Sequence, residues 1–104
     1  MLSVLPPARP LALRLSPPSP NPGHGVAHFD FEIPRREERV EVAVYDVNGR
    51  EVRRDRLGPL EPGDHTWTWN GRDRGGSAVY AGVYFTRLQV GRQTLTQKTV
   101  WVAP

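Results

Sequence analysis

Apolar and polar residues alternate along several short stretches of this chain, a pattern typical of strands that bury one face. In residues 26–33, for example, the apolar positions on one face are Phe29, Phe31 and Ile33. Seven stretches fit the description, or six if the first does not pair: residues 11–15, 26–33, 39–45, 50–57, 65–70, 82–90 and 94–102. Short strands that recur roughly every ten residues predict an all-β sandwich of seven strands.

The connection between residues 39–45 and residues 50–57 carries the clearest turn signal. Asn48-Gly49 is a dipeptide typical of tight antiparallel hairpins, and we expect both residues to take positive φ angles. Asp46 precedes the turn, where its carboxylate can accept hydrogen bonds from backbone N–H groups. The returning stretch is rich in arginine, which is typical of an edge strand protected against association.

A polar, glycine-rich loop, residues 71–82, separates two aromatic stretches. We expect Asn70 and Asp73 to hold this loop through local hydrogen bonds, while its glycines permit the turns. Trp69 and Tyr84 are expected to pack the two strands that the loop joins. The loop is therefore interpreted as a structural corner rather than an active-site loop.

The aromatic residues around this loop allow two interpretations. His65, Trp67 and Trp69 share one face of their stretch, and large rings dominate the core of a small domain. The pattern predicts that at least one tryptophan is buried and leaves the exposure of the other open. Alternatively, the tryptophans could join Tyr80 and Tyr84 in an aromatic platform for sugars.

Composition indicates one folded domain. The chain has 104 residues, and its 11 prolines and 10 glycines oppose long helices, since both residues interrupt them. We expect residues 1–15 to form an N-terminal arm or linker that ends in a first edge strand. Residues 16–104 are expected to form the domain.

The charge pattern argues against nucleic-acid binding. The net charge is +3, but acids and arginines are interleaved, whereas a nucleic-acid footprint is a surface of one sign. No run approaches the ~18 apolar residues that a membrane span needs. The apolar N-terminus is broken by prolines and lacks a basic start, so we expect no signal peptide in it.

No constellation for catalysis or cofactor binding is predicted. The chain has no cysteine, which excludes disulfides and thiolate chemistry. His24 and His28 lie in a proline- and glycine-rich stretch without a third metal ligand, and Asn70 with Asp73 lacks a regular calcium-loop pattern. Ser77 lies outside any G-x-S-x-G pattern, and no phosphate-binding loop is present. We expect no metal, no cofactor and no enzymatic activity.

Four segments of the chain contain, in order, six short motifs that resemble those of one known family. The segments "SPNPGHG", "VEVAVYDVNGREVRR", "LGPLEPGDHTWTWNGRDRGGSAVYAGVYFTRL" and "QTLTQKTVWV" resemble the immunoglobulin-like domain of the flagellar hook-capping protein, the FlgD-type domain. They also resemble the C-terminal sorting domain of proteins exported by the type IX (Por) secretion system. The resemblance covers roughly residues 16–102. Asn70 stands where the family commonly has aspartate, and Tyr80 where it usually has a small residue, so Tyr80 could extend the aromatic cluster.

The resemblance implies a non-catalytic, antiparallel Ig-like sandwich, usually found at the C-terminus of larger secreted or surface proteins. A secretion or surface-attachment machine would be the protein partner. Lys98 is the candidate contact, since it is the lone lysine of the chain and lies on the last strand. An export signal would then lie elsewhere. The residues that the motifs mark as structural are Asp46, Asn48, Gly49, Arg50, Gly63, Trp69, Asn70, Gly71, Asp73, Gly76, Gly82 and Tyr84.

Two other functions stay open from the sequence. One is a hook-cap-like assembly domain, which the same module implies. The other is a carbohydrate-binding or adhesion module that uses exposed Trp67, Tyr80 or Trp101.

Overall fold

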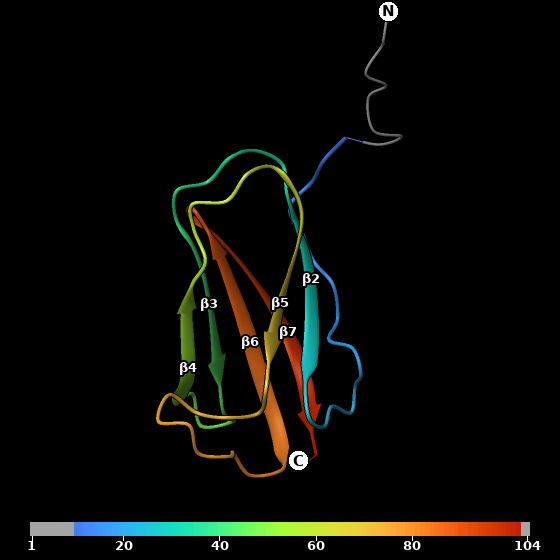
Figure 1. The fold of residues 1–104 in the computed structure, drawn as a ribbon, viewed down its shortest axis with the longest axis vertical. Coiled ribbons are helices and arrows are strands. Elements are labelled where there is room, and N and C mark those ends of the chain that lie inside the picture. Colours follow the sequence, from blue (N-terminus) through green and yellow to red (C-terminus); the bar gives the residue numbers. More distant parts are fainter. Residues whose placement is uncertain (1–9, 103–104) are drawn as a thin grey trace, which may run out of the picture.

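The computed structural model describes residues 10–102, which form two packed antiparallel sheets without a helix (Figure 1). One sheet has the strand order β1-β2-β5 and the other β4-β3-β6-β7. The strands are β1 (Arg14–Leu15), β2 (Ala27–Ile33), β3 (Val40–Tyr45), β4 (Glu51–Arg56), β5 (Gly63–Trp69), β6 (Gly82–Val90) and β7 (Gln93–Trp101). The predicted fold class, an all-β Ig-like sandwich of seven strands, is confirmed.

The core forms where the alternating faces of the two sheets meet. β2 pairs with β5 so that Phe29 lies opposite Trp67, and β3 pairs with β6 so that Val42 lies opposite Leu88. All four side chains are buried. The inner faces are therefore those that the alternation in the sequence indicated, because the period of two places every second residue inside.

The segment before β2 passes from one sheet to the other. The backbone N–H of Ser16 donates to the Asp30 carbonyl in β2, whereas that of Gly23 donates to the Val100 carbonyl in β7. The first strand is shorter than the expected residues 11–15, but Leu13 and Leu15 still pack against the core. This crossing covers one open side of the sandwich.

The same segment buries a carboxylate that the alternation places on the solvent side. Glu32 is only 3% exposed, because residues before β1 lie over it. Its Oε1 accepts the backbone N–H of Ala12 at 2.9 Å and lies 3.4 Å from Nε of Arg14. A contact 20 residues away along the chain decides this burial, so no local pattern could show it.

A hydrogen bond between side chains links the two sheets on the opposite side. The indole Nε1 of Trp67 in β5 donates to Oδ2 of Asp55 in β4 at 2.9 Å. Two N–H groups of Arg53 donate to the same carboxylate, at 2.9 and 3.2 Å. Asp55 thus closes the side of the sandwich between its two edge strands.

We expect Asp55 to make the fold sensitive to acid. Burial raises the pKa of this carboxyl, but hydrogen bonds from Arg53 and Trp67 outweigh burial, so the net pKa is lowered. A lowered folded-state pKa stabilises the fold above the unfolded pKa, and this contribution is lost as the pH falls below about 4. Chemical unfolding at pH 7 and pH 3 should show a loss of about 1 kcal/mol from this group.

Asp55→Asn is the matched control, because it keeps an oxygen acceptor for Trp67 but does not titrate. The stability difference between the wild type and this variant should shrink as the pH falls from 5 to 3. A difference that is constant over this range would show that Asp55 does not carry the effect.

Two threonines lie unusually deep in the four-stranded sheet. Thr86 and Thr99 are fully buried, and neither hydroxyl has a hydrogen-bond partner among the described residues. Burying a hydroxyl without a partner costs about 1–3 kcal/mol. We therefore expect Thr86→Val to raise the free energy of unfolding by about 1 kcal/mol, measured by urea denaturation. Thr86→Ser should lower it, since a methyl group is lost; a destabilised valine variant would contradict the argument.

Candidate functional site

Two tight turns of the same design lie at one end of the sandwich. In the first, Oδ1 of Asp46 accepts the backbone N–H groups of Asn48 and Arg50, each at 2.9 Å. The N–H of Gly49 donates to the Asp46 carbonyl at 3.0 Å, and Gly49 has φ of +83°. These bonds close the β3–β4 hairpin with a three-residue loop, residues 47–49, whose last residue is in the left-handed region.

The expectation for Asn48 was wrong. In the described chain only glycines take positive φ, so Asn48 contributes its backbone N–H and no left-handed conformation. The loop between Asp46 and Arg50 holds three residues rather than two, because the backbone N–H of Asp46 donates to the Arg50 carbonyl at 2.9 Å. The register shift between Val44 and Tyr45 is separate and leaves one extra residue, Val52, in β4. The Asn-Gly signal thus located the turn but not its type.

The negative charge of the Asp46 carboxylate is also compensated by a neighbouring arginine. Nε of Arg50 donates to its Oδ2 at 3.2 Å. The backbone N–H of Arg50 is the largest factor that holds the pKa of Asp46 below its usual value, with the N–H of Asn48 and the Arg50 charge acting in the same direction. The Asp46 carboxylate therefore stabilises the turn and is already hydrogen-bonded within it.

The second turn repeats this geometry inside the corner loop, residues 70–81. Oδ1 of Asp73 accepts the N–H groups of Gly75 and Ser77 at 2.9 Å each. The N–H of Gly76 donates to the Asp73 carbonyl at 3.0 Å, and Gly76 has φ of +86°. Oδ1 of Asn70 accepts the N–H of Arg72 at 3.1 Å. Asp73 and Asn70 thus bind backbone groups, which favours the capping interpretation over a calcium site.

The corner loop wraps around three buried aromatic rings. Trp69 is fully buried, its ring centroid lies 4.9 Å from that of Trp101 and 5.3 Å from that of Tyr84, and its Nε1 donates to the Arg72 carbonyl at 3.0 Å. Gly71 packs directly on the Trp101 ring, where a Cβ atom would come within 2.0 Å of Cζ2. The corner loop therefore covers the end of the hydrophobic core formed by these three rings.

Tyr84 ties the far end of the loop to the core. Its hydroxyl donates to the carbonyl of Tyr80 at 2.7 Å, and burial raises the pKa of the Tyr84 phenol. Gly82 begins β6 just before it, and Gly63 begins β5. The side chain of Tyr80 is 89% exposed, so the idea that it extends the aromatic cluster was wrong.

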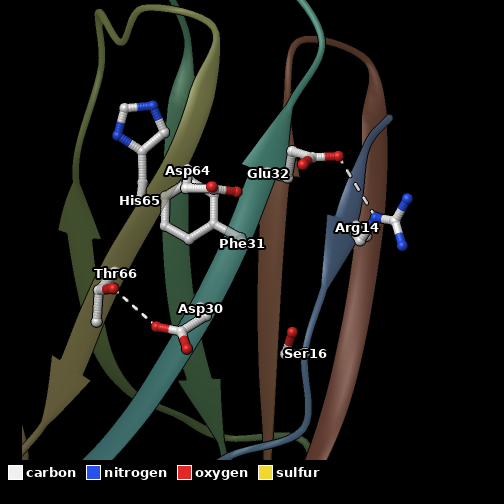
Figure 2. A pocket seen from close by; sticks show the side chains of 8 residues that line it. All are labelled: Arg14, Ser16, Asp30, Phe31, Glu32, Asp64, His65 and Thr66. Atoms are coloured by element: carbon white, nitrogen blue, oxygen red, sulfur yellow. Dashed lines mark hydrogen bonds and ion pairs between the residues drawn. The ribbon is translucent and has the colours of Figure 1, made fainter. Parts of the chain in front are cut away.

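An open depression of about 480 Å³ borders β1, β2 and β5 (Figure 2). Figure 2 shows two pairs among its polar side chains: Thr66 donates to Asp30 at 2.7 Å, and Nε of Arg14 lies 3.4 Å from Oε1 of Glu32. The remaining lining residues are Ser16, Phe31, Asp64 and His65. His65 stacks on Phe31 and its Nε2 lies 2.7 Å from the Glu61 carbonyl. No nucleophile with an adjacent base is assembled among these residues.

Metal and glycan sites find little support in this geometry. Within residues 10–102, no three His, Asp or Glu side chains are grouped to hold a metal ion. Trp67 and Trp101 are 7% and 1% exposed, so they are core residues and not the exposed platform that a glycan site would need. Only Tyr80 of that predicted set is exposed.

A model of the FlgD Ig-like domain family matches residues 19–93. The chain belongs to this family. It is 36% identical over 72 residues to the basal-body rod modification protein FlgD of Salmonella typhimurium; the match spans 66% of this chain and 31% of that protein. The chain therefore covers about a third of the curated relatives that it matches.

Two solved structures show the same fold. Dimeric latent PorU from Porphyromonas gingivalis superposes with a TM-score of 0.73 at 22% identity, over 97% of this chain and 10% of that chain. FlgD from P. aeruginosa superposes with a TM-score of 0.56 at 26% identity, over 72% of this chain and 60% of that chain. In both, the FlgD-like fold is one part of a longer chain.

The predicted contact residue of this FlgD-family domain lies apart from the corner. Lys98 is exposed in β7, an edge strand of the four-stranded sheet, opposite Phe85 of β6. In the described part of the chain, no helix could cross a membrane. The sequence thus marked two separate features: a corner that stabilises the fold and an exposed edge strand.

Proposed function

We propose that this chain is a non-catalytic Ig-like module of a larger exported protein, recognised by a type IX secretion or surface-attachment machine. Residues 16–104 would form the module, and residues 1–15 the arm that leads into it. The observation that carries the proposal is modular use of the fold: PorU from P. gingivalis contains it as 10% of its chain. Recognition would be by protein contact, without a bond being made or broken.

The distribution of polar groups supports a role in binding rather than catalysis. Asp46 and Asp73 accept backbone N–H groups of their turns. In the open depression, Asp30 accepts a hydrogen bond from Thr66, and Glu32 is paired with Arg14. The exposed terminal strand, by contrast, presents Lys98. We propose Lys98 as the partner contact and a secreted or cell-surface location for the whole protein.

Fusion to a reporter tests this function. The domain would be attached to the C-terminus of a reporter with its own Sec signal and expressed in a bacterium that has a type IX system. We expect the reporter at the cell surface, detected by protease accessibility on intact cells. Retention of the wild-type fusion in the periplasm would contradict the proposal, provided the unfused reporter also reaches the periplasm.

A flagellar assembly role is the second candidate. The 36% identity to the Salmonella protein FlgD favours it directly. Replacing the corresponding part of that protein with this full chain, which keeps β1 in the sheet, would test it. Restored swimming in a strain that lacks FlgD would support this role, whereas surface display without restored swimming would favour the first proposal.

A further inference from the structure

Among residues 10–102, the backbone groups on the outer edge of β7 are hydrogen-bonded at one end only, although the Gln97 side chain also donates to the Leu15 carbonyl of β1 at 2.7 Å. At that end, the backbone N–H of Val100 donates to Oδ1 of Asn21 at 3.0 Å, and its carbonyl accepts the N–H of Gly23 at 2.8 Å. The N–H of Val102 donates to the Gly23 carbonyl at 2.7 Å. The backbone groups of Val100 therefore point away from β6, toward the outside of the sheet.

The alternation of the strand extends this orientation along β7. Successive residues of a strand direct their N–H and C=O groups to opposite sides, so Thr94, Thr96 and Lys98 point the same way as Val100. In residues 10–102 no group bonds their backbone from the outer side, and all three side chains are exposed. Three residues thus offer unpaired donors and acceptors, which is a template for another strand.

Cations lie beside this edge, and the nearby carboxylate of Asp46 is paired with Arg50 at 3.2 Å. Lys98 and, on the neighbouring β6, Arg87 form no ion pair with any described residue. Arg87 lies 4.9 Å from the ring centroid of Tyr45, and it lines an open depression of about 540 Å³ with Phe85 and Thr96. These side chains share the outer face of the sheet, because Lys98 pairs with Phe85 and Thr96 with Arg87.

The opposite edge of the same sheet is neutralised. Arg54 of β4 lies 2.8 Å from the Glu51 carboxylate and 3.7 Å from that of Glu41, and Arg56 lies 3.9 Å from Glu41. The carbonyl of Val52 accepts the N–H of Arg74 from the corner loop. The outer face of the four-stranded sheet is therefore asymmetric: its positive charge is unpaired beside the β7 edge and paired with carboxylates beside the β4 edge.

We propose that the edge of β7 from Thr94 to Lys98 binds an extended acidic segment of a protein partner as an added strand. This inference rests on the proposed role in protein recognition and specifies how the partner would bind. Backbone hydrogen bonds from the three outward residues hold the segment, and its Asp or Glu side chains face Lys98 and Arg87. A second copy of this chain is disfavoured as the occupant, since pairing two such edges brings two unpaired lysines onto the same face.

A model peptide tests the mode directly. The probe is the capped octapeptide (Thr-Glu)4, with (Thr-Lys)4 as the charge-reversed control, titrated into the full chain labelled with ¹⁵N. We expect shifts at residues 94–98 and at Arg87, together with slower exchange of the Thr96 and Lys98 amides. No binding at millimolar peptide, equal binding of the basic peptide, or shifts confined elsewhere would overturn the proposal.

Three variants separate backbone pairing from charge. Thr96→Pro removes one outward N–H and leaves the bonds to β6 intact, so binding should be lost. Lys98→Glu should weaken binding by about tenfold or more, and it keeps the test valid if the proline variant does not fold. Arg35→Glu reverses an exposed cation on the loop between β2 and β3, outside the edge from Thr94 to Lys98, and should change binding less than about twofold. Equal effects of the lysine and Arg35 variants would contradict the site.

The same variants in the reporter fusion distinguish the two proposals. Surface display of the wild type that is lost in Lys98→Glu and kept in Arg35→Glu supports both. Display of all fusions alike overturns the edge as the recognition site but leaves the module's function standing. Periplasmic retention of the wild type overturns the function independently of the peptide result. Amide protection and a doubled mass on raising protein concentration, without peptide, would identify a second copy as the occupant instead.

Discussion

Replacing Gly71 with alanine is expected to cost about 4 kcal/mol of stability, a large part of the 5–15 kcal/mol typical of a domain. The new Cβ would lie 2.0 Å from Cζ2 and 2.4 Å from Cε2 of Trp101, and both are ring atoms that cannot bend away. The Gly71 backbone also has φ of +72°, which costs an L-residue about 1–2 kcal/mol. Urea denaturation followed by tryptophan fluorescence would measure the change.

Gly49→Ala separates the two causes of this loss. Gly49 has φ of +83°, but a Cβ there would meet no atom within 4 Å. It should therefore cost only the backbone term, about 1–2 kcal/mol. If Gly71→Ala cost no more than Gly49→Ala, the contact with Trp101 would not be the constraint that we infer.

Truncation of Trp69 is the second change with a large expected effect. Trp69→Ala should lower the free energy of unfolding by about 3–5 kcal/mol, as large-to-small changes of buried tryptophans do. The ring is fully buried between Trp101 and Tyr84, and the cavity would lie beneath the corner loop. Differential scanning calorimetry should show a lower Tm, with each kcal/mol worth about 4–8 °C in a domain of this size.

Trp69→Phe distinguishes packing from hydrogen bonding at this position. Phenylalanine fills much of the cavity but leaves the Arg72 carbonyl without the indole N–H that it accepts at 3.0 Å. We expect a loss of about 1–3 kcal/mol, clearly smaller than for alanine. Equal losses for both variants would mean that the hydrogen bond to the loop, and not the packed ring, dominates the contribution of Trp69.

The strand pattern was readable because it is local. β6 buries every second residue, since the side-chain period of a strand is two. β3 lies between two other strands and is buried at five consecutive positions, but its valines still follow the alternation. Both strands fall within stretches that the alternation indicated. The turns at Asp46 and Asp73 were located for the same reason: their carboxylates bind N–H groups two and four residues ahead. The sequence did not show that the two turns share the same hydrogen-bond pattern, because the residue two positions after the aspartate is Asn48 in one and Gly75 in the other.

The burial of all three tryptophans required the packed sandwich. Alternation assigns Trp67 to a face, but its exposure depends on what covers that face. Here the side between β4 and β5 is closed by Asp55, which comes from a strand that reads as polar. Glu32 is the reverse case, a residue on the outward face that the N-terminal segment buries.

By itself, the sequence determined the fold class, most strand positions, the two aspartate turns and the family, because these depend on side-chain period, on turn chemistry within five residues and on motif order. Only the tertiary structure decided why Gly71 must lack a side chain, how Asp55 joins the sheets and which edge of β7 is left unpaired. Each of these depends on residues far apart in the chain that meet in space. The interpretation of Lys98 depends on both. The sequence singled it out as the lone lysine, and the structure shows that, within residues 10–102, only residues 21–23 hydrogen-bond to the outer edge of β7, at the end beyond Lys98.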